Sequence, residues 1–182
     1  MKFKIYRALF LIGILFELIA QIFFRFGIRW SEPLDFPHWF LLLGVVFMIP
    51  QVISFPDKIY SYIGIPVMIA GIVGAIGMCV LDFTFWSYQS DYKAGSAFFK
   101  HISKVPAIWL PFMRIGPNII NWGLLLLSLN YLSSKETRWG VFVVILATIL
   151  YKTPIPYRLV FVYAFTLIGY GIIFYRSKPE AA

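Results

Sequence analysis

The stretch of sequence that decides the fold is YSYIGIPVMIAGIVGAIGMCVLDFTFW, residues 60–86. Asp82 is its single charged side chain. Its apolar residues show neither the alternation of a half-buried strand nor the three-to-four-residue spacing of a soluble amphipathic helix. Every backbone polar group of such a run must be satisfied within the segment when lipid surrounds it. The run therefore predicts a membrane-spanning α-helix.

Five other apolar runs have the same character and predict the rest of the fold. Together they indicate an all-α integral membrane protein, a bundle of six transmembrane helices in one domain, residues 1–182. The expected spans are 8–27, 38–55, 60–86, 105–131, 139–151 and 157–175. The run 139–151 would rise only about 20 Å as a helix, against a hydrocarbon core of about 30 Å. A full but short span is favoured there, with a re-entrant hairpin as the alternative.

Composition supports lipid as the main solvent. The 182 residues are 60% hydrophobic and 13% charged, with a mean hydropathy of +0.81, which leaves too little polar surface for a soluble domain. The net charge of +8 comes from residues between and beside the runs, so membrane lipids are the expected partners and nucleic acid is not. The single cysteine, Cys79, excludes an intrachain disulfide.

An even number of spans places both termini on one side of the membrane. Lysine and arginine number eight on the side of the termini and seven on the other, or eight to five if Arg25 and Arg158 lie at membrane depth. This bias favours cytoplasmic termini, and we expect a bacterial inner membrane. Although the N-terminus is basic, no small-x-small cleavage site follows it and Glu17 interrupts the apolar run, so a retained helix is expected instead of a signal peptide.

Two stripes of polar residues lie inside the expected spans. The first is Glu17, Gln21 and Arg25, and the second is Arg114, Asn118, Asn121 and Ser128. Each stripe falls on one face of its helix, and ionisable groups in hydrocarbon turn toward partners. We therefore expect the two stripes to face each other or a wet cavity, with Glu17 and Arg114 as the preferred ion pair.

Other polar side chains could complete this lining, namely Gln51, Asp82, Tyr163, Thr166 and Tyr170. The predicted ligand-binding or buried polar network comprises Glu17, Gln21, Arg114, Asn118, Asn121, Asp82 and Gln51. The structural alternative stays open, because buried pairs and amides often only set helix register. Asn118 and Asn121 suit interhelical hydrogen bonds, and snorkelling to the interface is a rival role for Asp82, Arg25 and Arg158.

The parts that an enzyme or cofactor site would need are missing from the spans. His38 and His101 fall at a span end and in a loop, where an interfacial role is expected rather than metal or haem ligation. No serine has a histidine base at a readable spacing, so catalysis has little support and no cofactor is expected. The segment 87–104 is expected to be a surface connection, with a short interfacial helix capped by Ser96 as the alternative.

The C-terminal half resembles small uncharacterised multi-span membrane proteins of bacteria. The resembling pieces are Gly116-Pro117 leading into Gly123-Leu124-Leu125-Leu126-Leu127, then Arg138-Trp139-Gly140, and then Gly169-Tyr170 before a basic tail. The resemblance implies a six-span bundle and brings no activity with it.

Two functions are consistent with these observations. The first is the binding or transport of a small solute, ion or lipid at the intramembrane polar site. The second is a non-catalytic structural or accessory subunit that associates with other membrane subunits or with copies of itself. The two polar stripes favour the first, because they exceed what helix register needs.

Overall fold

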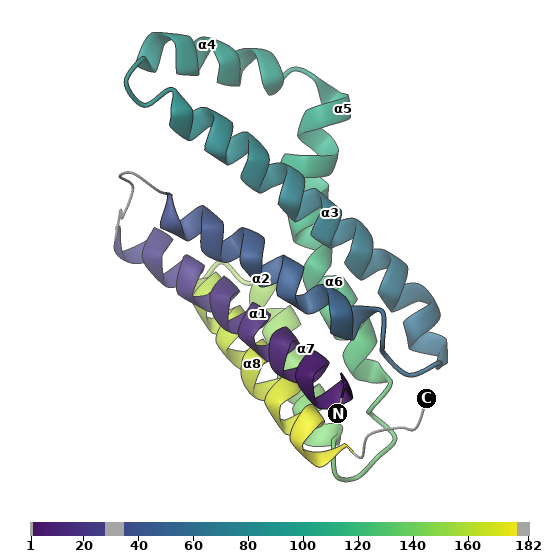
Figure 1. The fold of residues 1–182 in the computed structure, drawn as a ribbon. Coiled ribbons are helices and arrows are strands. Elements are labelled where there is room, and N and C mark those ends of the chain that lie inside the picture. Colours follow the sequence, from purple (N-terminus) through teal and green to yellow (C-terminus); the bar gives the residue numbers. More distant parts are fainter. Residues whose placement is uncertain (1, 28–34, 178–182) are drawn as a thin grey trace.

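The computed structural model of the protein describes residues 2–27 and 35–177. These residues form helices joined by short turns, and no strand occurs among them (Figure 1). Arg29 and Lys178, which entered the charge count, lie outside the described residues. The predicted all-helical class is therefore confirmed for the described part of the chain.

Each predicted span coincides with a helical segment. The elements are α1 (Lys2–Phe26), α2 (Phe36–Val52), α3 (Ile59–Ser87), α4 (Tyr92–Ile102), α5 (Pro106–Ile108), the π-helix η1 (Trp109–Ile115), α6 (Gly116–Leu129), α7 (Arg138–Lys152) and α8 (Arg158–Arg176). We call the end where α1 finishes and α8 begins the distal end. The opposite end, where α1 begins and α8 finishes, is the proximal end (Figure 1).

Four of these segments are long and apolar enough to cross a membrane: Lys2–Phe26, Ile59–Ser87, Pro106–Leu129 and Arg158–Arg176. α2 is apolar but has 17 residues, and α7 has 15. At 1.5 Å per residue these two helices rise only about 25 Å and about 22 Å. Helix length alone thus supports four spans.

Pairs of glycines bring the helices together in three close crossings. A β-carbon built on Gly13 would lie 2.5 Å from the carbonyl oxygen of Gly44, where α1 crosses α2. The corresponding distance from Gly74 to the Cα atom of Gly116 is 2.3 Å, where α3 crosses the start of α6. α7 and α8 cross at Gly140 and Gly169, again with 2.5 Å to a carbonyl oxygen. Only glycine permits such approaches, so these pairs select the helix partners.

The helix neighbours differ from the expected ones. α1 packs mainly on α2 and α8, whereas α6 packs on α3, η1 and α7. The prediction that the polar faces of the first and fourth spans lie against each other is therefore wrong. The physical reason is that the glycine crossings pair α1 with α2 and α6 with α3.

The fourth apolar segment is not a regular α-helix. Its first part is η1, a π-helical stretch, and Pro106, Pro111 and Pro117 punctuate the region. Pro106 stands at the start of the segment, whereas Pro111 and Pro117 lie within it and, lacking a backbone N–H, cannot donate the regular helical hydrogen bond. The wider π-helical winding follows, and it turns successive side chains away from the α-helical stripe that the sequence pattern assumes.

The segment 87–104 contains a helix, α4, that folds back beside the end of α3 and leads into α5 (Figure 1). Asp91 caps it, because its carboxylate accepts a hydrogen bond from the backbone N–H of Ala94 at 2.9 Å. The expected surface connection is thus helical, and Ser96 is not its cap. None of the α4 residues is buried.

The main core lies between α1, α2, α3, α6, α7 and α8 and is rich in aromatic rings. Tyr170 is completely buried, its ring lies 4.9 Å from that of Phe10, and its hydroxyl donates a 2.6 Å hydrogen bond to the carbonyl oxygen of Leu124. Phe55 and Phe174 complete this cluster. The polar end of Tyr170 is thus satisfied by a helix backbone, as buried tyrosines require.

Candidate functional site

Glu17 is the most deeply buried acidic side chain of the described residues. It lies on α1 and is 3% exposed. The side chain of Tyr163, on α8, is buried beside this carboxylate. From the other side, Oε1 of Glu17 would lie 3.1 Å from a β-carbon on Gly44, so the glycine leaves room for the carboxylate against α2. Three helices therefore enclose the carboxyl group.

Arg114 is not the partner of Glu17. It lies on η1 with an exposed side chain, and no ion pair within 4.0 Å joins it to an acidic side chain among the described residues. The predicted Glu17–Arg114 ion pair is therefore wrong. The pair does not form because the helices pair as described above, so that α8 and not α6 packs against α1.

The other residues of the predicted network are dispersed. Gln21 is half-buried on α1, and Asn121 is buried on α6. Asn118 is exposed, donates to the carbonyl oxygen of Arg114 and accepts a hydrogen bond from the hydroxyl of Tyr151 on α7. Gln51 is buried at the proximal end of α2, and its side-chain oxygen has no hydrogen-bond partner. These residues do not form one continuous site.

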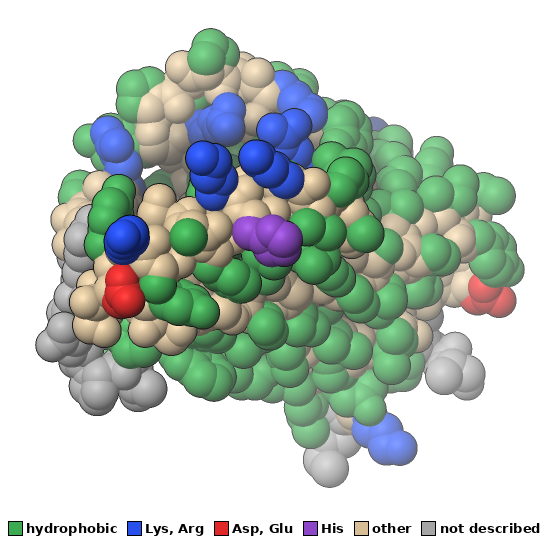
Figure 2. Space-filling model, turned by 90° about the horizontal axis from the view of Figure 1, so that it is seen from above, with side chains coloured by type: hydrophobic (Ala, Val, Ile, Leu, Met, Phe, Trp, Pro, Cys, Tyr) green, Lys and Arg blue, Asp and Glu red, His purple; other side chains and the backbone are tan. Residues whose placement is uncertain are grey.

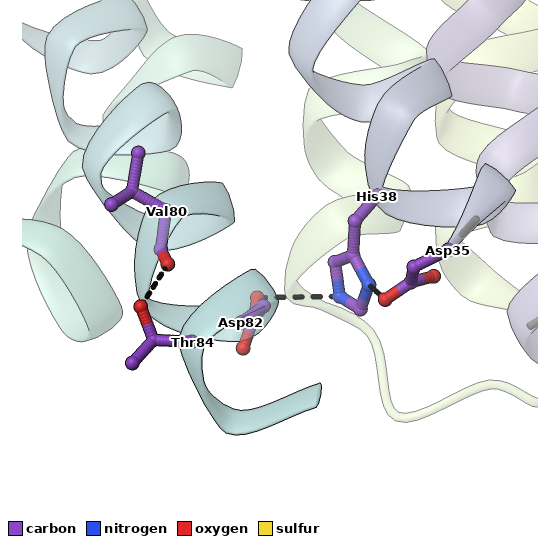
Figure 3. Close-up of polar contacts among 5 residues, drawn as sticks. All are labelled: Asp35, His38, Val80, Asp82 and Thr84. Atoms are coloured by element: carbon purple, nitrogen blue, oxygen red, sulfur yellow. Dashed lines mark hydrogen bonds and ion pairs between the residues drawn. The ribbon is translucent and has the colours of Figure 1, made fainter. Parts of the chain in front are cut away.

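A second polar cluster joins α2 to α3 near the distal end (Figure 3). His38 lies between two carboxylates: its Nδ1 atom is 2.5 Å from Oδ2 of Asp35, and its Nε2 atom is 3.3 Å from Oδ2 of Asp82. The ring is packed against Phe24 of α1, with 4.9 Å between the centroids. Only the doubly protonated imidazolium can donate to both carboxylates at once.

Asp82 was predicted from the sequence, whereas Asp35 was not and His38 was interpreted as an interfacial residue. The i, i+3 spacing of Asp35 and His38 at the start of α2 is a signal that could have indicated their contact. No local signal could have shown that Asp82 approaches from α3. That contact is long-range.

An apolar layer separates this cluster from Glu17. Ala20, Leu41 and Cys79 are buried together between α1, α2 and α3. Leu41 lies about one helical turn from His38 on α2, and Cys79 lies about one turn from Asp82 on α3. The two polar groups thus occupy one region of the bundle, on either side of a thin apolar barrier.

A pocket of about 460 Å³ opens at the distal end between α1 and α8. Gln21 and Arg25 of α1 line one wall, and Tyr157 and Arg158 line the other. Gln21 is one helical turn from Glu17, so the pocket and the buried carboxyl group share the same face of α1. Two residues of the predicted first stripe, Gln21 and Arg25, are therefore accessible in this pocket.

Basic side chains also gather on the surface around α4. Lys93, Lys100 and His101 are exposed on this helix, and Lys104 follows it. Figure 2 shows Lys and Arg side chains collected on this side of the molecule among hydrophobic ones. Such a combination is typical of a surface at the level of lipid headgroups.

Comparison of the chain with protein-family models, with curated proteins and with solved structures finds no match. The class that the structure defines is therefore an all-helical protein with four helices able to cross a membrane. Glu17, the His38 cluster and the distal pocket are the features of this protein that bear on its function.

Proposed function

We propose that the protein binds and transports a small solute or ion across the membrane, with the carboxyl group of Glu17 as the intramembrane binding group. The single observation that carries this proposal is a buried carboxyl group beside a buried tyrosine side chain, with no cation in contact among the described residues. A lone carboxylate in hydrocarbon costs several kcal/mol. A proton or a small cation at this position removes that cost.

The position of Glu17 suits exchange with one side of the membrane. Gln21 and Arg25 continue the same face of α1 into the distal pocket. The His38 cluster lies beyond the apolar layer of Ala20, Leu41 and Cys79. A small separation of α1 from α2 or α8 would connect Glu17 to either polar group, which is how alternating access to a buried site is commonly achieved.

The proposed topology has six spans, with α2 and α7 as short spans beside the four long ones. Antiparallel packing of α1 with α2 and of α7 with α8 supports this topology, since each short helix lies along a longer one. Bilayer thinning or tilt of neighbouring helices accommodates the shorter pair. We place both termini in the cytoplasm of a bacterial cell, following the bias of basic residues and the resemblance of the C-terminal half.

Flux measurements on the full chain in liposomes test the transport role. Purified protein is reconstituted with an internal pH-sensitive dye, and proton, sodium or potassium gradients are imposed in turn. We expect flux with wild type, loss of most of it in Glu17→Gln, and partial loss in Tyr163→Phe. The matched control is Glu136→Gln, because Glu136 is an exposed glutamate in the turn before α7.

A second candidate is a structural subunit of a larger membrane assembly. The tight glycine crossing beside Glu17 favours this candidate, because Gly13 and Gly44 leave no space between α1 and α2. If wild type and Glu17→Gln show the same flux under every gradient, the transport proposal is wrong. A stable partner of fixed stoichiometry on purification from the native membrane would then support the structural role.

A further inference from the structure

We infer that the distal pocket, lined by Gln21, Phe24, Arg25, Tyr157, Arg158 and Leu159, is a binding site for a phosphate-bearing anion. The inference is separate from the role of Glu17, because it rests on the arginines at the mouth of the pocket. A phosphate monoester in water and the phosphate of an anionic lipid headgroup present the same chemistry to such a site.

Within the described part of the chain, the charge of the pocket is uncompensated. Arg25 and Arg158 approach from α1 and α8, and the described lining residues include no carboxylate. Neither arginine forms an ion pair with an acidic side chain among residues 2–27 and 35–177. Two cations held in one pocket repel each other, and a bound anion relieves this repulsion.

Aromatic rings hold the two guanidinium groups. Cζ of Arg25 lies 4.1 Å from the centroid of the Tyr157 ring, and Cζ of Arg158 lies 5.9 Å from that of Tyr151. Cation–π contact uses the face of a guanidinium and leaves its N–H groups at the edge free to donate. The planar fork of arginine matches two phosphate oxygens, so a pre-positioned pair suits a phosphate group.

Lys152 adds a third cation to the same region. Its Nζ atom lies 5.2 Å from the centroid of the Tyr151 ring, so Lys152 and Arg158 share one aromatic neighbour. Three basic side chains therefore surround the turn between α7 and α8. This density of positive charge would attract an anion from solution or from the membrane surface.

The backbone contributes to the same charge. Tyr157 has a φ of 59°, a left-handed conformation that is uncommon for a residue other than glycine. This conformation turns the chain sharply after Pro156, so that α8 begins at Arg158 beside the pocket. The first N–H groups of a helix have no intrahelical acceptor and carry partial positive charge, which adds to the arginines.

Much of the remaining lining is apolar. Phe24, Leu159 and Val160 line the pocket together with the arginines. A volume of about 460 Å³ exceeds what a bare phosphate needs and falls in the range of small-molecule sites. The pocket thus has room for the glycerol or other organic portion that carries the phosphate.

Native mass spectrometry and calorimetry of the full chain in neutral detergent test this site and its source of phosphate. Adducts of dioleoyl phosphatidic acid are compared with adducts of dioleoyl phosphatidylcholine, and inorganic phosphate is titrated at constant ionic strength. The test variant is Arg25→Gln/Arg158→Gln. The matched control is Lys4→Gln/Lys135→Gln, which removes two exposed basic residues at the proximal end.

We expect the arginine variant to lose affinity by at least about tenfold and the control by less than about twofold, since each charge-assisted contact is worth about a factor of ten. Loss of phosphatidic acid adducts alone identifies a lipid headgroup, and loss of phosphate binding alone identifies a soluble ligand. Equal binding by wild type, variant and control overturns the inference. If the glutamine variant does not fold, Arg25→Lys/Arg158→Lys, which keeps the charge, is measured instead. We expect its loss of affinity to lie between those of the control and the glutamine variant.

Transport and phosphate binding can fail independently. Loss of flux in Glu17→Gln with unchanged phosphate binding supports both assignments. Loss of phosphate binding in the arginine variant with unchanged cation flux also leaves both in place.

Discussion

The Nε2 atom of His38 lies 3.3 Å from Oδ2 of Asp82, and this contact joins the start of α2 to the end of α3. The ring simultaneously contacts Asp35 through Nδ1, so one imidazole serves two carboxylates (Figure 3). Both carboxylates are largely withdrawn from solvent. The contact is therefore a proton-dependent link between two helices.

Replacement of His38 by glutamine should weaken this link. The substitution leaves at least one carboxylate without a charged partner, so we expect the protein in detergent to lose about 1–3 kcal/mol of stability. Thermal unfolding followed by circular dichroism measures the loss. His101→Gln is the matched control, because His101 is exposed on α4 and should leave the midpoint unchanged.

The stabilising effect of His38 should depend on pH. When the ring is protonated, both of its nitrogens donate hydrogen bonds, and when it is neutral only one can. The contribution of His38 to stability is therefore present at low pH and falls as pH rises. The difference in unfolding midpoint between wild type and His38→Gln should shrink between pH 5.5 and pH 8.5, values that bracket about 6.5, the ordinary pKa of histidine. A difference that does not vary with pH would show that the ring acts only by packing.

Glu17 and Tyr163 should be energetically coupled. In a double-mutant cycle with Glu17→Gln and Tyr163→Phe, we expect a coupling free energy of about 0.5–3 kcal/mol, because the two buried polar side chains lie next to each other. The cycle with Glu17→Gln and Arg114→Gln should be additive, since Arg114 is exposed on η1. Strong coupling to Arg114 and none to Tyr163 would contradict the helix arrangement.

The glycine crossing of α3 and α6 should tolerate no side chain. A β-carbon on Gly74 would lie 2.3 Å from the Cα atom of Gly116, so Gly74→Ala must push the two helices apart. We expect a loss of about 1–3 kcal/mol on thermal unfolding in detergent. Gly171→Ala is the control within α8, because nothing lies within 4 Å of its added methyl group, and it should be neutral or slightly stabilising.

Arg7 should stabilise the proximal end of α8. Its Nη1 atom donates to the carbonyl oxygens of Phe174 and Ser177, each at 3.1 Å, and so satisfies acceptors at the C-terminal end of that helix. Arg7→Gln should cost about 1–2 kcal/mol and speed amide exchange in the last turn of α8. Lys4→Gln should change neither, because Lys4 is exposed on the same helix. Unaltered exchange in Arg7→Gln would refute this capping role.

An interaction between residues close in the sequence could be predicted, whereas one between residues far apart could not. The face of α1 that carries Glu17, Gln21 and Arg25 could be predicted, because helical periodicity is a local property. Tyr163 was expected to line a polar interior, yet nothing along the chain indicated that it would lie beside Glu17. Two oppositely charged residues in separate helices suggested a pair, but the glycine contacts between the helices gave Glu17 a different neighbour.

By itself, the sequence determined that this protein is helical and that its helices begin and end close to the predicted positions. Long apolar runs leave the backbone no other way to satisfy its hydrogen bonds in lipid, and prolines and polar turns mark where each run stops. Only the tertiary structure decided which helices are neighbours, and hence that Glu17 meets Tyr163, that His38 meets Asp82 and that Arg25 and Arg158 share a pocket. Periodicity along one helix defines a face, whereas the partner of that face depends on contacts between residues distant in the chain.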